Sequence, residues 1–168
     1  MHSWQLASLY SRSLFESNGP LSDHMVNSVA VTKEPDSRRV DKNAAAVFWR
    51  RSAQCQVVMN NAFDQGHWEA AGINAVHCAI SANDAVLASG PEVKVTGKDH
   101  LDAVRLVLSR LKDEDAQAAA KRLDIILSKK SRVEYEQKRL SEKEARELVL
   151  DAERFFDWAK TRLPESAL

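Results

Sequence analysis

The sequence has few cysteines and no excess of charge of either sign. Its 168 residues include two cysteines, five glycines and four prolines, which excludes a disulfide-rich scaffold and a collagen-like or low-complexity chain. Lysine and arginine total 24, as do aspartate and glutamate, so a uniformly basic nucleic-acid binder is also excluded. No apolar run is long enough to span a bilayer. With 44% hydrophobic residues, the composition is typical of one globular domain.

The first 40 residues are rich in serine and show no sustained helical or strand period. We expect this segment to be disordered or derived from an expression vector, because His24-Met25 matches the dipeptide that a common cloning junction leaves. Whether residues 1–24 are native stays open, and we assign residues 41–168 to a single folded domain. The segment has no signal-peptide pattern, so the cytoplasm is the expected location. Cys55 and Cys78 are expected to be buried thiols in a reducing compartment.

Apolar residues recur with a helical period almost everywhere from residue 41 onward. The pattern predicts an all-α fold, an antiparallel up-and-down helical bundle of four long helices plus one shorter helix. The second segment is rich in alanine, and small residues let a helix approach its neighbours closely, so we expect it to lie centrally. The expected helical segments are 41–66, 67–89, 99–111, 113–133 and 141–163.

Local signals mark the ends of these helices. Asp41 is the expected N-cap of the first segment, and Gly90-Pro91 ends the second because proline cannot continue a helix. Residues 91–97 are expected to form a loop, since the alternation of Val93 and Val95 is too short to support a sheet. Ser141 followed by Glu144 predicts a capping box at the start of the last helix.

A polar row lies on the alanine-rich segment. Its members are spaced i, i+3, i+7 and i+10, which places them on one helix face: Asn74, His77, Ser81 and Asp84. One interpretation makes this row the floor of a polar pocket, with His77 as a general base or a ligand-binding group. The other makes it a hydrogen-bonded structural row. No histidine or carboxylate follows His77 by four residues, so we predict neither a metal site nor a cofactor.

The only basic concentration in the chain spans residues 121–139, with seven cations against three acids. Lys130 and Arg132 could contact phosphates, and Tyr135 could stack on a base. A solvated helix end, whose cations complement the helix dipole, is the alternative. His100, at a helix start, is expected either to contact an anion or to be a surface or capping residue.

Tryptophans on several helices suggest a contact surface. The aromatic side chains cannot all lie on the buried faces of their helices, and those that could be exposed include Trp49, Trp68 and Trp158. Exposed aromatic residues are typical of a homodimer interface. We therefore expect a homodimer, and a purely structural dimerisation module is one function left open.

Several stretches together resemble a known family. An alanine-rich helix ending in glycine (residues 70–90, AAGINAVHCAISANDAVLASG) precedes a polar helix start (residues 98–101, KDHL). Further on, residues 131–135 (SRVEY) precede a capping box (residues 141–145, SEKEA) and a final amphipathic helix (residues 152–155, AERF). These features, in this order over residues 43–163, are similar to HEPN domains (higher eukaryotes and prokaryotes nucleotide-binding).

The resemblance implies an all-α bundle, often dimeric, and it implies two kinds of function. The family includes ribonucleases of toxin–antitoxin and defence systems and also non-catalytic relatives that bind nucleotide or RNA. The ribonuclease pattern is arginine followed by histidine after four to six residues, and no arginine precedes His67, His77 or His100 at that spacing. Lys94 is the nearest substitute, and lysine lacks the planar guanidinium fork. A non-catalytic binding module is therefore the expected function, with a cognate protein as a further partner.

A binding role gives a defined set of candidate residues. The site would use side chains from the central helix, the following helix start and the basic cluster: Asn74, His77, Asp84, His100, Lys130, Arg132 and Tyr135. A metal-independent ribonuclease with a divergent site, using His77 or His100 as general base, is the enzymatic alternative.

Overall fold

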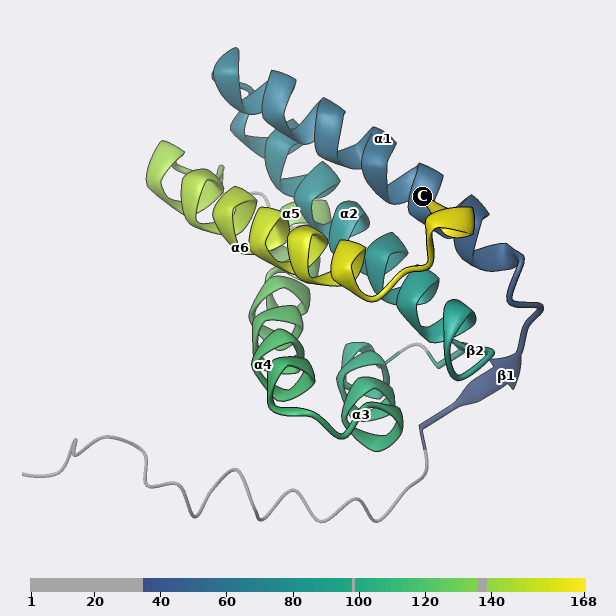
Figure 1. Cartoon of the computed structure of the whole chain (residues 1–168). Coiled ribbons are helices and arrows are strands. Elements are labelled where there is room, and N and C mark those ends of the chain that lie inside the picture. Colours follow the sequence, from purple (N-terminus) through teal and green to yellow (C-terminus); the bar gives the residue numbers. More distant parts are fainter. Residues whose placement is uncertain (1–34, 98, 136–138) are drawn as a thin grey trace, which may run out of the picture. The chain divides into compact units, whose positions relative to one another are not determined.

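The computed structural model describes residues 35–97, 99–135 and 139–168 (Figure 1). The expectation for residues 1–34 lies outside the described residues. The described part is mostly helical, in agreement with the all-α class, and it also holds a small sheet. Its elements, in chain order, are β1 (Ser37–Arg39), α1 (Ala44–Asp64), α2 (Trp68–Ser89), β2 (Val93–Val95), α3 (His100–Arg110), α4 (Glu114–Ser128), α5 (Lys130–Tyr135), α6 (Glu142–Thr161) and the 3₁₀ turn η1 (Glu165–Ala167).

Helix α2 lies at the centre of the packing, as its alanine content predicts. It packs along α1 on one side and α6 on the other, and it also contacts α3, α4 and α5 (Figure 1). Nearly every residue of its second half is buried, from Ser81 to Ala88. Small side chains allow this, because the backbones of neighbouring helices can then approach closely. Helices α3 and α4 pack against each other, and α4 also contacts α6.

The helix starts follow local hydrogen bonding. Asp99 and Asp113 cap α3 and α4 by accepting from the backbone N–H groups of Leu101 and Ala116. The capping box of Ser141 and Glu144 is present, which confirms that prediction. The expectation that Asp41 is the N-cap of α1 is wrong, since Asn43 holds that position. Asp41 instead accepts from the Asn43 N–H at 2.8 Å, which closes a turn just before the helix.

The expectation of a loop without a sheet at residues 91–97 is corrected. Strand β2 pairs with β1 in antiparallel register, with Arg38 opposite Lys94. Backbone bonds extend the pairing on both sides, from the Val40 N–H to the Glu92 carbonyl and from the Thr96 N–H to the Asp36 carbonyl, each 2.9 Å. The partner strand lies before residue 41, the expected start of the domain, so residues 37–40 belong to the fold. A three-residue ladder leaves no periodicity in the sequence.

The segment expected to run unbroken from residue 113 to 133 is two helices. Helix α4 ends at Ser128, and α5 begins at Lys130. The change of direction brings Val133 onto α2, where a Cβ on Gly72 would lie only 3.2 Å from a Val133 methyl group. Val133 is buried there against a glycine, and the helical period of the sequence continues through the break without a signal.

The tryptophans differ in burial. Trp49 is 6% exposed and stacks on Phe156, with ring centroids 4.3 Å apart. It is a core residue, which corrects the expectation that it lies in an exposed seam; the stacking partner on α6 was not evident from the sequence. Trp68 and Trp158 are half-buried, beside Phe63 and Phe155 respectively.

Candidate binding cavity

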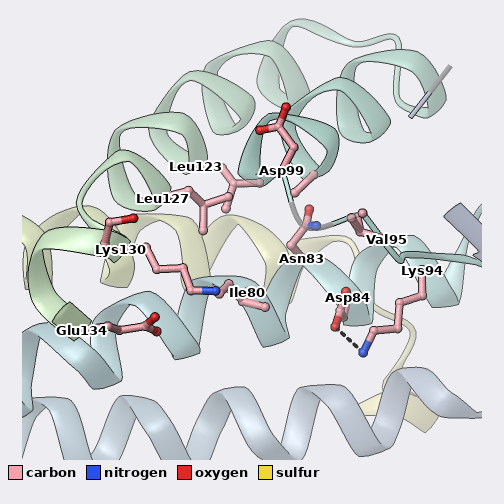
Figure 2. Close-up of a pocket in the computed structure, with 13 residues that line it drawn as sticks. Ile80, Asn83, Asp84, Lys94, Val95, Asp99, Leu123, Leu127, Lys130 and Glu134 are labelled. Carbon is pink, nitrogen blue, oxygen red and sulfur yellow. Dashed lines mark ion pairs between the residues drawn. The ribbon is translucent and has the colours of Figure 1, made fainter. Parts of the chain in front are cut away.

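A cavity of about 410 Å³ lies beside α2, walled by β2 and the residues after it, by α3 and α4, and by α5 (Figure 2). Its volume falls within the range of small-molecule sites. Ile80, Leu123 and Leu127 supply apolar wall, whereas Asn83, Asp84, Lys94, Asp99, Lys130 and Glu134 supply polar groups. Apolar walls with a few polar groups are typical of ligand-binding pockets.

Two elements place the inner polar groups. Ile80, Asn83 and Asp84 follow one another at i, i+3 and i+4 on α2, so they share one helix face. Lys94 is in the middle of β2, where pairing with β1 fixes the backbone. The small sheet is therefore what holds a lysine over the second half of α2.

Asp84 and Lys94 form a largely buried ion pair. The Lys94 ammonium lies 2.9 Å from Asp84 Oδ2, and the same nitrogen lies 4.5 Å from the centroid of the Phe48 ring. Burial raises the pKa of the Asp84 carboxyl above its usual value, and the hydrogen bond and charge of Lys94 oppose that rise. Because this lysine is already neutralised, it has little charge left for an anionic ligand.

Asn83 is the most unusual polar residue in the cavity wall. Its side chain is 2% exposed, and its Oδ1 accepts no hydrogen bond within the described part of the chain. Leaving a buried acceptor without a donor costs about 1–3 kcal/mol. Unpaired buried groups of this kind are rare in native proteins, and a bound ligand is one means of satisfying them.

Lys130 begins α5 and is half-buried at the opposite wall. Figure 2 shows its side chain running across the cavity toward Ile80. No described residue forms an ion pair or a hydrogen bond with its ammonium. Lys130 therefore differs from Lys94, since its positive charge remains available to an anion.

The rim next to α5 carries a histidine–carboxylate contact. Nε2 of His77 lies 3.5 Å from Glu134 Oε1, with the His77 side chain 49% exposed and Glu134 13% exposed. Glu134 also lines the cavity, whereas His77 lies outside its wall. The contact connects α2 to α5 at the edge of the site.

The candidate residues from the sequence separate into groups. Asp84 and Lys130 line the cavity, and His77 lies at its rim. Asn74 donates to the Ala70 carbonyl of its own helix at 2.8 Å and does not line the cavity. The side chains of His100 and Tyr135 lie outside the described part of the structure.

Arg132 is on another face of α5. Its Nη2 lies 2.6 Å from Oε1 of Glu144, the acidic member of the capping box. Both residues line a second, smaller hollow of about 210 Å³ between α4, α5 and α6. Arg132 is thus held by the start of α6 and is not brought together with Asp84 and Lys130.

Asn83, Lys94 and Glu134 were not among the binding candidates. Asn83 follows Ile80 and adjoins Asp84, but an asparagine among alanines on a buried helix has no pattern of its own. The position of Lys94 in the cavity wall depends on the pairing of β1 with β2, which the sequence did not reveal. Glu134 lies within the basic cluster, where it was counted only as a charge.

Comparison with protein-family models gives no match, and no curated protein matches the sequence significantly. Within the described residues, no helix combines the length and apolar character needed to cross a bilayer.

Proposed function

We propose that this chain is a non-catalytic, HEPN-like binding module in which the helices pack as an up-and-down bundle, and that it binds a nucleotide in the cavity beside α2. The observation that carries the proposal is the presence of two unsatisfied groups in one cavity. Among the described residues, the Lys130 ammonium forms no ion pair, and Asn83 Oδ1 is a buried acceptor without a donor. A nucleotide presents a phosphate for the first and base N–H groups for the second.

The remaining wall fits such a ligand. Ile80, Leu123 and Leu127 give an apolar surface against which the face of a base can pack. The volume of about 410 Å³ is suited to one nucleotide unit rather than to an extended strand. Glu134 and Asp99, which carry negative charge at the wall, limit how much phosphate the site accommodates and favour a monophosphate.

Calorimetric titration of the full chain with mononucleotides at low salt tests the proposal. We expect the Lys130→Gln variant to bind about tenfold more weakly, since a charge-assisted hydrogen bond contributes about 1.5 kcal/mol or more. Lys129→Gln is the matched control, because Lys129 lines the second hollow and not the cavity. Absence of binding by the unmodified chain contradicts the proposal, and binding of RNA oligomers alone would assign the site to RNA instead.

The contact of His77 with Glu134 favours one other function, a metal-independent ribonuclease. A carboxylate 3.5 Å from Nε2 can orient the imidazole, which suits a general base. An RNA-cleavage assay with His77→Ala and His100→Ala decides this. Cleavage that is unchanged in both variants eliminates these two roles, and no cleavage by the unmodified chain removes the enzymatic function.

Exposed valines on α1 support the expected homodimer. Val47, Val57 and Val58 are 56%, 58% and 48% exposed, although the seam no longer includes Trp49. Light scattering over a range of concentrations measures the mass directly. A monomer at high concentration contradicts the homodimer.

A further inference from the structure

The inner end of the cavity is rich in hydrogen-bond acceptors. Asn83 and Asp84 are consecutive on α2, are 2% and 5% exposed, and both line the cavity. Asp84 Oδ2 is occupied by Lys94 at 2.9 Å, whereas Asn83 Oδ1 has no donor among the described residues. Figure 2 shows the Asn83 amide directed toward the segment that follows β2, on the cavity side of α2.

Three neighbouring donors in the described part of the chain already have other acceptors. The N–H groups of Thr96 and Gly97, which follow β2, both donate to the Asp36 carbonyl, at 2.9 and 3.4 Å. The Lys94 ammonium is held by Asp84 and by the Phe48 ring. No donor for Asn83 Oδ1 is therefore left among the described residues, and a ligand in the cavity can supply one.

Ligands that differ only in an amino or an oxo group meet this acceptor differently. An exocyclic amino group donates an N–H to Oδ1, whereas a carbonyl at the same place sets two oxygen acceptors against each other and leaves both unpaired. Building on the proposed nucleotide site, we infer that the cavity selects bases with an exocyclic amino group. It takes cytosine or adenine nucleotides in preference to uracil or hypoxanthine nucleotides.

Two pairs of monophosphates test this inference in the unmodified chain. Cytidine and uridine monophosphates differ at one exocyclic group and at the adjacent ring nitrogen, which is an acceptor in cytosine and an N–H donor in uracil. Adenosine and inosine monophosphates differ in the same way. We expect the amino member of each pair to bind at least tenfold more tightly in calorimetric titrations. Equal affinities, or a preference for the oxo members, overturn the inference while leaving the proposed nucleotide site intact. Absence of binding by all four compounds overturns both.

Substitution of Asn83 gives an independent measurement. Asn83→Leu keeps the branched shape of the side chain and removes the unpaired acceptor, so we expect the ratio of affinities for the amino and oxo nucleotides to fall to about one. The same change should raise the melting temperature of the ligand-free protein, because a buried polar group without a partner is lost. Asn83→Asp keeps the acceptor and should keep the preference for amino bases.

Asn61→Leu, on the exposed side of α1, is the control for the loss of an asparagine. It should leave the ratio unchanged. An amino-over-oxo ratio that persists in Asn83→Leu contradicts the assignment to Asn83, and a preference lost in Asn83→Asp does so as well.

Discussion

The ammonium of Lys94 joins the carboxylate of Asp84 at 2.9 Å, and this contact connects the small sheet to the centre of α2. Asp84 is 5% exposed, so its charge depends on a partner from another element. The ion pair therefore stabilises the fold and also forms part of the cavity wall. It fixes β2 against the helix that supplies the inner polar groups.

Lys94→Met should destabilise the protein by about 2 kcal/mol. Breaking a fully buried pair costs about 3–5 kcal/mol, and the cost is lower here because the Lys94 side chain is 26% exposed. The free energy of unfolding from urea titration measures the change, with the exposed Lys121→Met as control. In the double variant Asp84→Leu, Lys94→Met much of the loss should be recovered. A single variant as stable as the unmodified chain would show that the pair contributes nothing.

Glu144 should make the stability depend on pH in acid. Hydrogen bonds from the Ser141 backbone N–H and hydroxyl, and then from Arg132, lower the pKa of its carboxyl to about 2 from 4.5. The folded state thus favours the ionised form, and this stabilisation is present above pH 4.5 and lost as the pH falls toward 2. Glu144→Gln should therefore flatten the decline of the free energy of unfolding in that interval.

Part of the decline should remain in Glu144→Gln, because Arg162 holds the pKa of Asp113 below its usual value. Glu147→Gln, whose side chain is 63% exposed, is the matched control and should follow the unmodified chain. Identical acid profiles for Glu144→Gln and the unmodified chain would contradict the assigned hydrogen bonds.

Gly97→Ala should disturb the cavity wall. A Cβ at this position would overlap the carboxylate of Asp102, which is itself 5% exposed and near Arg105. Relieving such a clash costs about 1–3 kcal/mol. Gly90→Ala is the control, since the nearest atom to its Cβ would be the Val86 carbonyl oxygen at 3.8 Å. Thermal unfolding of both variants checks this, and equal melting temperatures would contradict it.

The two cysteines should differ in reactivity. Cys78 is fully buried, and burial raises the pKa of its thiol to about 12, so almost no thiolate is available for alkylation. Burial also raises the pKa of Cys55, but this residue is partly exposed. Mass spectrometry after brief alkylation of the native protein should find label on Cys55 before Cys78, with both labelled in urea. Rapid native labelling of Cys78 would be inconsistent with its burial.

Long helices were predictable because burial of one face repeats along them. The alanine content of α2 and the capping box of α6 both led to correct features. Pairing of β1 with β2 was not predictable, since three residues on each strand cannot establish a period and Ser37–Arg39 has no apolar pattern. The break before Lys130 was also hidden, because the helical period continues through it. The packing of Val133 on Gly72, 61 residues earlier in the sequence, is visible only in the structure.

Part of the cavity wall was also predictable from the sequence. Asp84 and Lys130 were named from helix spacing and from the basic cluster, and both line it. Asn83 was missed because its significance depends on the donors that surround it, and Thr96 and Gly97 donate to Asp36 only in the folded sheet. Charge alone predicts Arg132 in the site, whereas in the structure its guanidinium contacts Glu144.

The most direct test of the account is a titration of the isotopically labelled full chain with adenosine monophosphate at low salt, followed by amide resonances in NMR. The side-chain amide of Asn83 reports on the inner acceptor, and the backbone amide of Lys130 reports on the opposite wall. We expect both resonances to shift and saturate together. Unchanged resonances at these two groups, or shifts centred on Arg132 and Glu144 in the second hollow, would contradict the proposed site.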